Sequence, residues 1–299
     1  MLNLRKRIRT TPLLLWRHAV IAMLIIPTLG FALPRPRASG LAPVNGTRLY
    51  YEIYGRGTPI VLLHAGLADS RMWDQQVDYF SGRHTVLRFD ARGFGRSEAP
   101  NQPYVPVDDL HDLLRFVGMN RACVVGLSMG GTIAIDFAAA YPEAVSCLVI
   151  VAGTPAWQPY SNSLVERVTT ILTAGQQKGP TAVAEGWLND PMFAAAKSQP
   201  RLIQQMKVLL TQNAPGFLST PYMDSPDIPV PDLDKLKIPT LVLVGDRDDK
   251  EVVDRAYTMT RSMPDAREVI IKGAGHMVNL EKPREFNRAL EQFFERHPN

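Results

Sequence analysis

The sequence predicts an α/β fold with a mostly parallel eight-stranded sheet, helices on both faces and an inserted helical cap. Three observations predict it. Short apolar runs alternate along the chain with longer stretches of helical periodicity, which is typical of parallel sheets. Residues 122–126 and 147–152 are almost continuously apolar, as in strands buried on both faces. One long interval contains no strand pattern. Right-handed crossovers then place a ligand site at the C-terminal ends of the strands.

The individual elements follow from these periodicities. Strands are predicted at residues 48–54, 60–63, 85–89, 122–126, 147–152, 241–244 and 268–271. Helices between them are predicted at residues 72–80, 107–117, 129–140, 252–262 and 283–294. The core is therefore expected in two parts, residues 41–153 and residues 238–299.

Residues 154–237 interrupt this alternation. They contain amphipathic helical pieces, such as residues 164–172 and 201–210, joined by prolines. An interval of this length is too long for a simple loop. Because it enters at the C-terminal end of a central strand, we interpret it as a helical cap over the site rather than a structural excursion.

Residues 1–40 are predicted to be an export signal or a membrane anchor. A basic stretch precedes the apolar run 19–33, whose length suits a signal peptide, and cleavage after Ala32 would follow a small-x-small site. The rival interpretation is an uncleaved anchor through residues 13–33. The protein is accordingly expected to be exported to the periplasm or the extracellular space, or attached to a membrane.

The charge distribution argues against a nucleic-acid partner. Seven of the 33 basic residues lie in the first 37 positions, where no acidic residue occurs. The rest of the chain contains the remaining 26 basic residues and all 29 acidic residues, so its net charge is −3. The basicity belongs to the N-terminal segment and not to a binding face.

Cys123 and Cys147 both fall in apolar runs that are predicted to be central strands. Buried thiols are the default expectation there, with a disulfide between neighbouring strands as an alternative. No spacing of ligands predicts a metal site.

The strongest chemical motif is Gly126-Leu127-Ser128-Met129-Gly130. It joins a predicted strand to a predicted apolar helix. That context is typical of a sharp turn that exposes a serine nucleophile at the top of a sheet. Small residues are needed on both sides because the turn crowds the neighbouring backbone. A glycine-rich helix start is the alternative.

A serine needs a base, and His276 follows the last predicted strand among flexible residues. A carboxylate must hold its tautomer. We select Asp248, while Asp246 and Asp249 are close alternatives, and any of the three could instead cap the next helix. Two amides must bind the oxyanion, and we assign them to Met129 and Gly66.

The segments His64-Ala65-Gly66-Leu67 and Asp90-Ala91-Arg92-Gly93-Phe94-Gly95-Arg96-Ser97, together with the serine motif, resemble the α/β-hydrolase superfamily over residues 44–294. Its small capped members include esterases, enol-lactonases and cofactor-free haloperoxidases. In the first segment Ala65 replaces the usual glycine. The second segment is expected to be a structural turn.

The resemblance and the motifs together predict a serine hydrolase acting on a small carboxylic ester or lactone, with no cofactor and no metal. Acyl transfer or perhydrolysis at the same residues is the alternative, and a binding protein without catalysis is a third. An apolar pocket is predicted from the following residues, although those within the cap could equally form its core: Leu67, Trp157, Trp187, Met192 and Phe193.

Overall fold

The computed structural model describes residues 33–218 and 232–297. Within them one sheet has the order β1-β2-β4-β3-β5-β6-β7-β8. Its first two pairs, β1–β2 and β2–β4, are antiparallel and the other five pairs are parallel. The strands are β1 (Ala38–Val44), β2 (Thr47–Tyr54), β3 (Thr58–Leu63), β4 (His84–Phe89), β5 (Ala122–Leu127), β6 (Val145–Val151), β7 (Thr240–Gly245) and β8 (Ala266–Ile271). The predicted fold class is confirmed.

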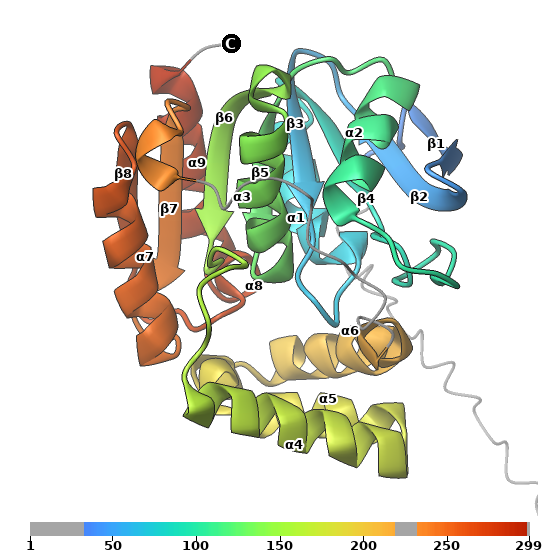
Figure 1. Cartoon of the computed structure of the whole chain (residues 1–299), viewed down its shortest axis with the longest axis vertical. Coiled ribbons are helices and arrows are strands. Elements are labelled where there is room, and N and C mark those ends of the chain that lie inside the picture. The colour runs from blue at the N-terminus through green and yellow to red at the C-terminus, as the bar shows by residue number, and fades with distance from the viewer. Residues whose placement is uncertain (1–32, 219–231, 298–299) are drawn as a thin grey trace, which may run out of the picture. The chain divides into compact units, whose positions relative to one another are not determined.

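Helices cover both faces of this sheet, and further helices lie beyond the C-terminal ends of its parallel strands (Figure 1). Helices α2 and α3 pack against each other on one face, and α1 packs against α9 on the other. The helices are α1 (Asp74–Phe80), α2 (Pro106–Phe116), α3 (Met129–Ala140), α4 (Asn162–Lys178), α5 (Pro180–Asn189), α6 (Pro200–Leu218), α7 (Lys250–Ser262), α8 (Val278–Glu281) and α9 (Pro283–Arg296).

The strand β1 was not among the predicted elements, and it crosses the expected boundary between residues 40 and 41. Its signal is nevertheless present. Asn45 and Gly46 both have positive φ angles, 44° and 72°, and join β1 to β2 as a two-residue turn. Asn-Gly is the preferred pair for such a hairpin because both residues tolerate this backbone region. The first strand of the sheet therefore begins at Ala38, three residues before the predicted start of the core.

The central strands supply the interior of the molecule. Every residue of β5, β6 and β7 is buried. Cys123 and Cys147 lie opposite each other in the β5–β6 register and form a disulfide. The default expectation of two free thiols is therefore wrong, because parallel pairing brings these two side chains to the same face of neighbouring strands.

Helices α4, α5 and α6 lie between β6 and β7 in the chain, within the interval predicted to be a cap. They pack on one another beyond the C-terminal ends of the parallel strands (Figure 1). Polar contacts attach them to the core. The side-chain amide of Asn213 donates to Asp69 Oδ2 at 2.8 Å and accepts from the Gly95 amide at 2.9 Å. Arg167 of α4 pairs with Asp249, which lies just before α7.

The predicted signal or anchor falls almost wholly within residues 1–32, which lie outside the described residues. In the described part of the chain, no helix combines the length and the apolar character that crossing a membrane requires.

Candidate active site

Ser128 occupies the turn between β5 and α3. Its backbone has φ 54° and ψ −115°, a conformation that is costly for a residue with a side chain. The turn is tight enough that a Cβ on Gly126 would lie 2.0 Å from the carbonyl oxygen of Gly130. Glycine at position 126 is therefore a steric requirement. The geometry is that of the predicted strand–turn–helix elbow, and it leaves Ser128 at the N-terminus of α3.

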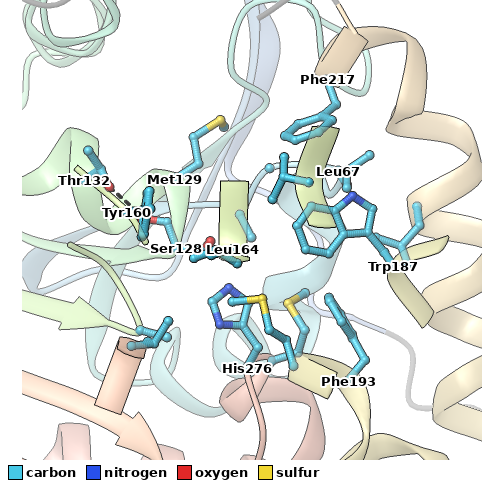
Figure 2. Close-up of a pocket in the computed structure, with 18 of the residues that line it drawn as sticks. Leu67, Ser128, Met129, Thr132, Tyr160, Leu164, Trp187, Phe193, Phe217 and His276 are labelled. Atoms are coloured by element: carbon cyan, nitrogen blue, oxygen red, sulfur yellow. Dashed lines mark hydrogen bonds between the residues drawn. The ribbon is translucent and has the colours of Figure 1, made fainter. Parts of the chain in front are cut away.

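A cavity of about 320 Å³ opens above this turn, between the sheet and the inserted helices. Ser128 and His276 both line it, and Figure 2 shows the imidazole facing the serine across the cavity. Among the described residues no hydrogen bond joins the two side chains. Such contacts are often loose in a ligand-free enzyme and tighten when substrate binds.

His276 is hydrogen-bonded to Asp248. Its Nδ1 lies 2.9 Å from Oδ2 and 3.2 Å from Oδ1 of the carboxylate. The side chain of Asp248 is completely buried, and its Oδ1 also accepts from the Asp249 amide at 2.7 Å. A buried carboxylate at Nδ1 favours the tautomer with a proton on that nitrogen, which leaves Nε2 free to act as a base.

The other two candidate carboxylates have different partners. Asp246 accepts from the Gly273 amide at 2.6 Å, so it joins the loops after β7 and β8. Asp249 caps α7 by accepting from the Glu251 amide at 2.9 Å. Of the three, Asp248 is the one whose carboxylate contacts His276.

The charge around His276 favours its protonated form. Burial alone would lower the pKa of His276, but the charge and hydrogen bond of Asp248 outweigh it. Glu281 and Asp190 add to the effect, and the pKa is raised above the ordinary value for imidazole.

Glu281 was not predicted as a site residue. Its buried carboxylate accepts from the amides of Gly275 at 2.8 Å and Met277 at 3.1 Å, the two residues that flank His276. Burial raises the pKa of Glu281, while these two hydrogen bonds act in the opposite direction. In the sequence, Glu281 is marked only by its position five residues after His276. That spacing alone does not predict a contact with the loop that carries the histidine.

Two backbone amides near Ser128 are free to bind an anion. Within the described residues neither the Met129 amide nor the Gly66 amide has a hydrogen-bond acceptor, and both residues line the cavity. The loop that carries Gly66 is held by His64, whose Nε2 accepts from the Ala91 amide at 2.9 Å and whose Nδ1 lies 2.8 Å from the Ala65 carbonyl oxygen. Alanine at position 65 is therefore compatible with an ordered loop.

The cavity wall includes most of the predicted pocket residues. Leu67, Trp187, Met192 and Phe193 line it, whereas Trp157 does not. Further lining residues that were not singled out from the sequence are Thr132, Tyr160, Leu164, Val165, Val168, Thr169, Leu210, Phe217 and Val252. Four of them, Leu164, Val165, Val168 and Thr169, lie on α4. The helical periodicity of residues 164–172 in the sequence could have indicated this part of the wall.

The chain matches the Alpha/beta hydrolase family over residues 60–289 and belongs to it. A 3-oxoadipate enol-lactonase of Acinetobacter baylyi is 28% identical over 256 residues, covering 83% of this chain and 93% of the relative. The enol-lactonase structure from Burkholderia xenovorans superposes with a TM-score of 0.76 at 26% identity, covering 86% of this chain and all of that one.

A second solved structure is described as an N-acyl homoserine lactone degrading enzyme. It is 27% identical, has a TM-score of 0.70 and covers 85% of this chain and all of its own. The expected resemblance to the superfamily is thus confirmed by sequence and by fold.

Proposed function

We propose that this protein is a serine hydrolase that cleaves a carboxylic ester or lactone of a small molecule through an acyl-enzyme on Ser128. One observation carries the proposal. Ser128 lies on a strained turn that opens into an apolar cavity, opposite an imidazole that is paired with a buried carboxylate. The named relatives include enzymes for an enol-lactone and for an N-acyl homoserine lactone, which supports an ester or lactone substrate.

In the acylation half of the reaction, His276 Nε2 takes the proton from Ser128 Oγ as this oxygen attacks the substrate carbonyl carbon. The oxyanion that forms accepts hydrogen bonds from the amides of Met129 and Gly66. Asp248 stabilises the imidazolium through Nδ1. The imidazolium then protonates the leaving alkoxide oxygen, the bond between carbonyl carbon and alkoxide oxygen breaks, and the acyl group remains on Ser128.

Deacylation reverses these roles with water as the nucleophile. His276 removes a proton from water, the hydroxide oxygen bonds to the acyl carbon, and the bond to Ser128 Oγ breaks. The proton held by His276 returns to Oγ, and the carboxylic acid leaves. For a lactone the alcohol and the acid are two ends of one product.

We infer further that α4, α5 and α6 act as a lid over this site. Trp187 of α5 and Phe217 of α6 line the cavity, as does Phe193 between these helices. The backbone amide of His276 also bonds to the carbonyl of Met192, which belongs to the same insertion. A wall of this kind would hold the acyl group and limit water in the site.

The test is hydrolysis of p-nitrophenyl esters from acetate to decanoate by the purified chain and by Ser128→Ala. We expect activity on short acyl chains and a loss of at least about 10³-fold in kcat/KM for the variant. A fluorophosphonate should label the wild-type protein on the peptide that contains Ser128. Retention of activity in Ser128→Ala would overturn the assignment of the nucleophile.

We also propose that the protein is exported. The basic and apolar pattern of residues 1–33 supports this, as does the disulfide between Cys123 and Cys147, because such bonds persist in oxidising compartments. Fractionation of cells that express the full chain should place it outside the cytoplasm, with the disulfide protected from alkylation until it is reduced. Recovery in the cytoplasm with two alkylatable thiols would contradict export.

A further inference from the structure

The charge composition of the cavity wall limits which substrates it can bind. Among its twenty described residues, His276 is the only one with a side chain that ionises near neutral pH, and none is Lys, Arg, Asp or Glu. Leu67, Trp187, Phe193 and Phe217 lie together on one side of Ser128 in Figure 2. The ring centroid of Trp187 lies 6.0 Å from that of Phe193 and 6.2 Å from that of Phe217, so these three form a continuous aromatic surface.

Two hydroxyl groups that line the cavity, those of Thr132 and Tyr160, already have hydrogen-bond partners. Thr132 Oγ1 donates to the Thr154 carbonyl at 2.7 Å, and Tyr160 Oη lies 2.6 Å from Thr154 Oγ1. Apart from the proposed oxyanion amides, the free polar groups of the described wall include Trp187 Nε1, which has no acceptor among the described residues, and the Thr169 hydroxyl, and neither carries a charge.

Two arginines next to lining residues of the cavity are also paired with carboxylates. Arg167 on α4 pairs with Asp190 and Asp249. Arg255 on α7 pairs with Glu251 and lies over the ring of Tyr160, with its guanidinium carbon 4.7 Å from the ring centroid. Neither arginine lines the cavity. Withdrawing either one to bind a substrate would leave its carboxylate partners without a counter-ion.

Negative charge, in contrast, lies directly behind the catalytic histidine. Asp248, Glu281 and Asp190 all favour the protonated form of His276 through their charge. A carboxylate on the substrate would enter a largely apolar cavity whose described lining residues include no Lys or Arg to pair with it, and this acidic cluster lies beyond the wall. Burying an unpaired carboxylate is strongly unfavourable, whereas an alkyl group of the same shape gains from burial.

We infer, on the basis of the proposed function, that the site selects uncharged esters and lactones with an apolar acyl group and rejects substrates that carry a carboxylate on it. The aromatic surface formed by Trp187, Phe193 and Phe217 binds the acyl group. Selectivity against the anion comes from the absence of Lys and Arg among the described residues of the cavity wall.

Two isosteric methyl esters test this inference. In monomethyl succinate a carboxylate occupies the place of the terminal isopropyl group of methyl 4-methylpentanoate. We expect the wild-type chain to hydrolyse the second ester with a kcat/KM at least about 100-fold higher, measured by release of methanol and corrected for the rates with hydroxide. Equal rates, or a preference for the succinate ester, would overturn the inference.

A variant tests the cause of the selectivity. Val165 lies on α4, lines the cavity and is 49% exposed, so a long charged side chain can be accommodated there. Val165→Arg should reduce the preference for the neutral ester at least about tenfold, and the uncharged control Val165→Gln should leave it within about threefold. If Val165→Arg leaves the preference unchanged, the missing cation is not its cause and the inference fails.

Failure of the inference can be told apart from failure of the proposed function. If Ser128 reacts with the fluorophosphonate and both methyl esters are cleaved equally well, only the selectivity is wrong. If no ester is cleaved and Ser128 is not labelled, the proposed function is wrong and the selectivity falls with it.

Discussion

The backbone amide of His276 donates a hydrogen bond of 3.2 Å to the carbonyl oxygen of Met192. This bond joins the loop after the last strand to the helical insertion between β6 and β7. The proposed base is therefore held by two separate parts of the chain. Asp248 holds its ring from the loop after β7, and the insertion holds its backbone.

Asp248→Asn should lower kcat/KM about 10³- to 10⁴-fold, because a neutral amide neither fixes the tautomer of His276 nor stabilises its imidazolium. Ester hydrolysis at saturating and limiting substrate measures the loss. The control is Asp246→Asn. This carboxylate lies two residues before Asp248 in the same loop and accepts from the Gly273 amide. If both variants lose activity equally, Asp248 has no special role.

The pH dependence of kcat/KM should show an acid limb above 6.5, the ordinary pKa of histidine, because Asp248 and its acidic neighbours raise the pKa of His276. The base must be neutral to accept a proton. Activity is therefore lost as pH falls through the raised pKa and is retained above it. A series of initial rates from pH 5 to pH 9 measures the limb, and an inflection below 6.5 would contradict the assigned electrostatics.

Glu281→Gln should move that acid limb to lower pH, because the negative charge of Glu281 contributes to the raised pKa of His276. It should also reduce kcat at least about tenfold, since a side-chain amide cannot accept from both flanking amides and the histidine loses its position. The exposed Glu285→Gln is the control. A purely structural role for Glu281 would lower activity without moving the limb.

Gly126→Ala should lower the free energy of unfolding by at least about 2 kcal/mol, because the new Cβ would overlap the Gly130 carbonyl oxygen and open the turn at Ser128. Urea denaturation followed by circular dichroism measures the difference. At Gly82 a Cβ would meet no atom within 4 Å, so Gly82→Ala should change stability by about 0.5 kcal/mol or less. Equal stabilities would show that the turn is not close-packed.

The sequence by itself predicted most of the fold. Apolar residues recur with different periods in strands and in helices. This pattern predicted the helix at residues 129–140, which are the bounds of α3, and ended the strand before it one residue short of the observed end of β5. The first strand, Ala38–Val44, lies at the edge of the sheet and was missed because its residues show no regular apolar alternation, although Asn45-Gly46 is a typical turn sequence.

Tertiary structure decided the rest. Which aspartate meets His276 depends on the pairing of Gly245 with Ile271 in neighbouring strands, which sets the loops after β7 and β8 beside each other. The same holds for the Cys123–Cys147 disulfide and for Phe217, which reaches the cavity from a helix 89 positions after Ser128. The sequence determined each element and the chemical types available, because these depend on near neighbours. Contacts between distant residues depend on strand register and packing, which no local pattern specifies.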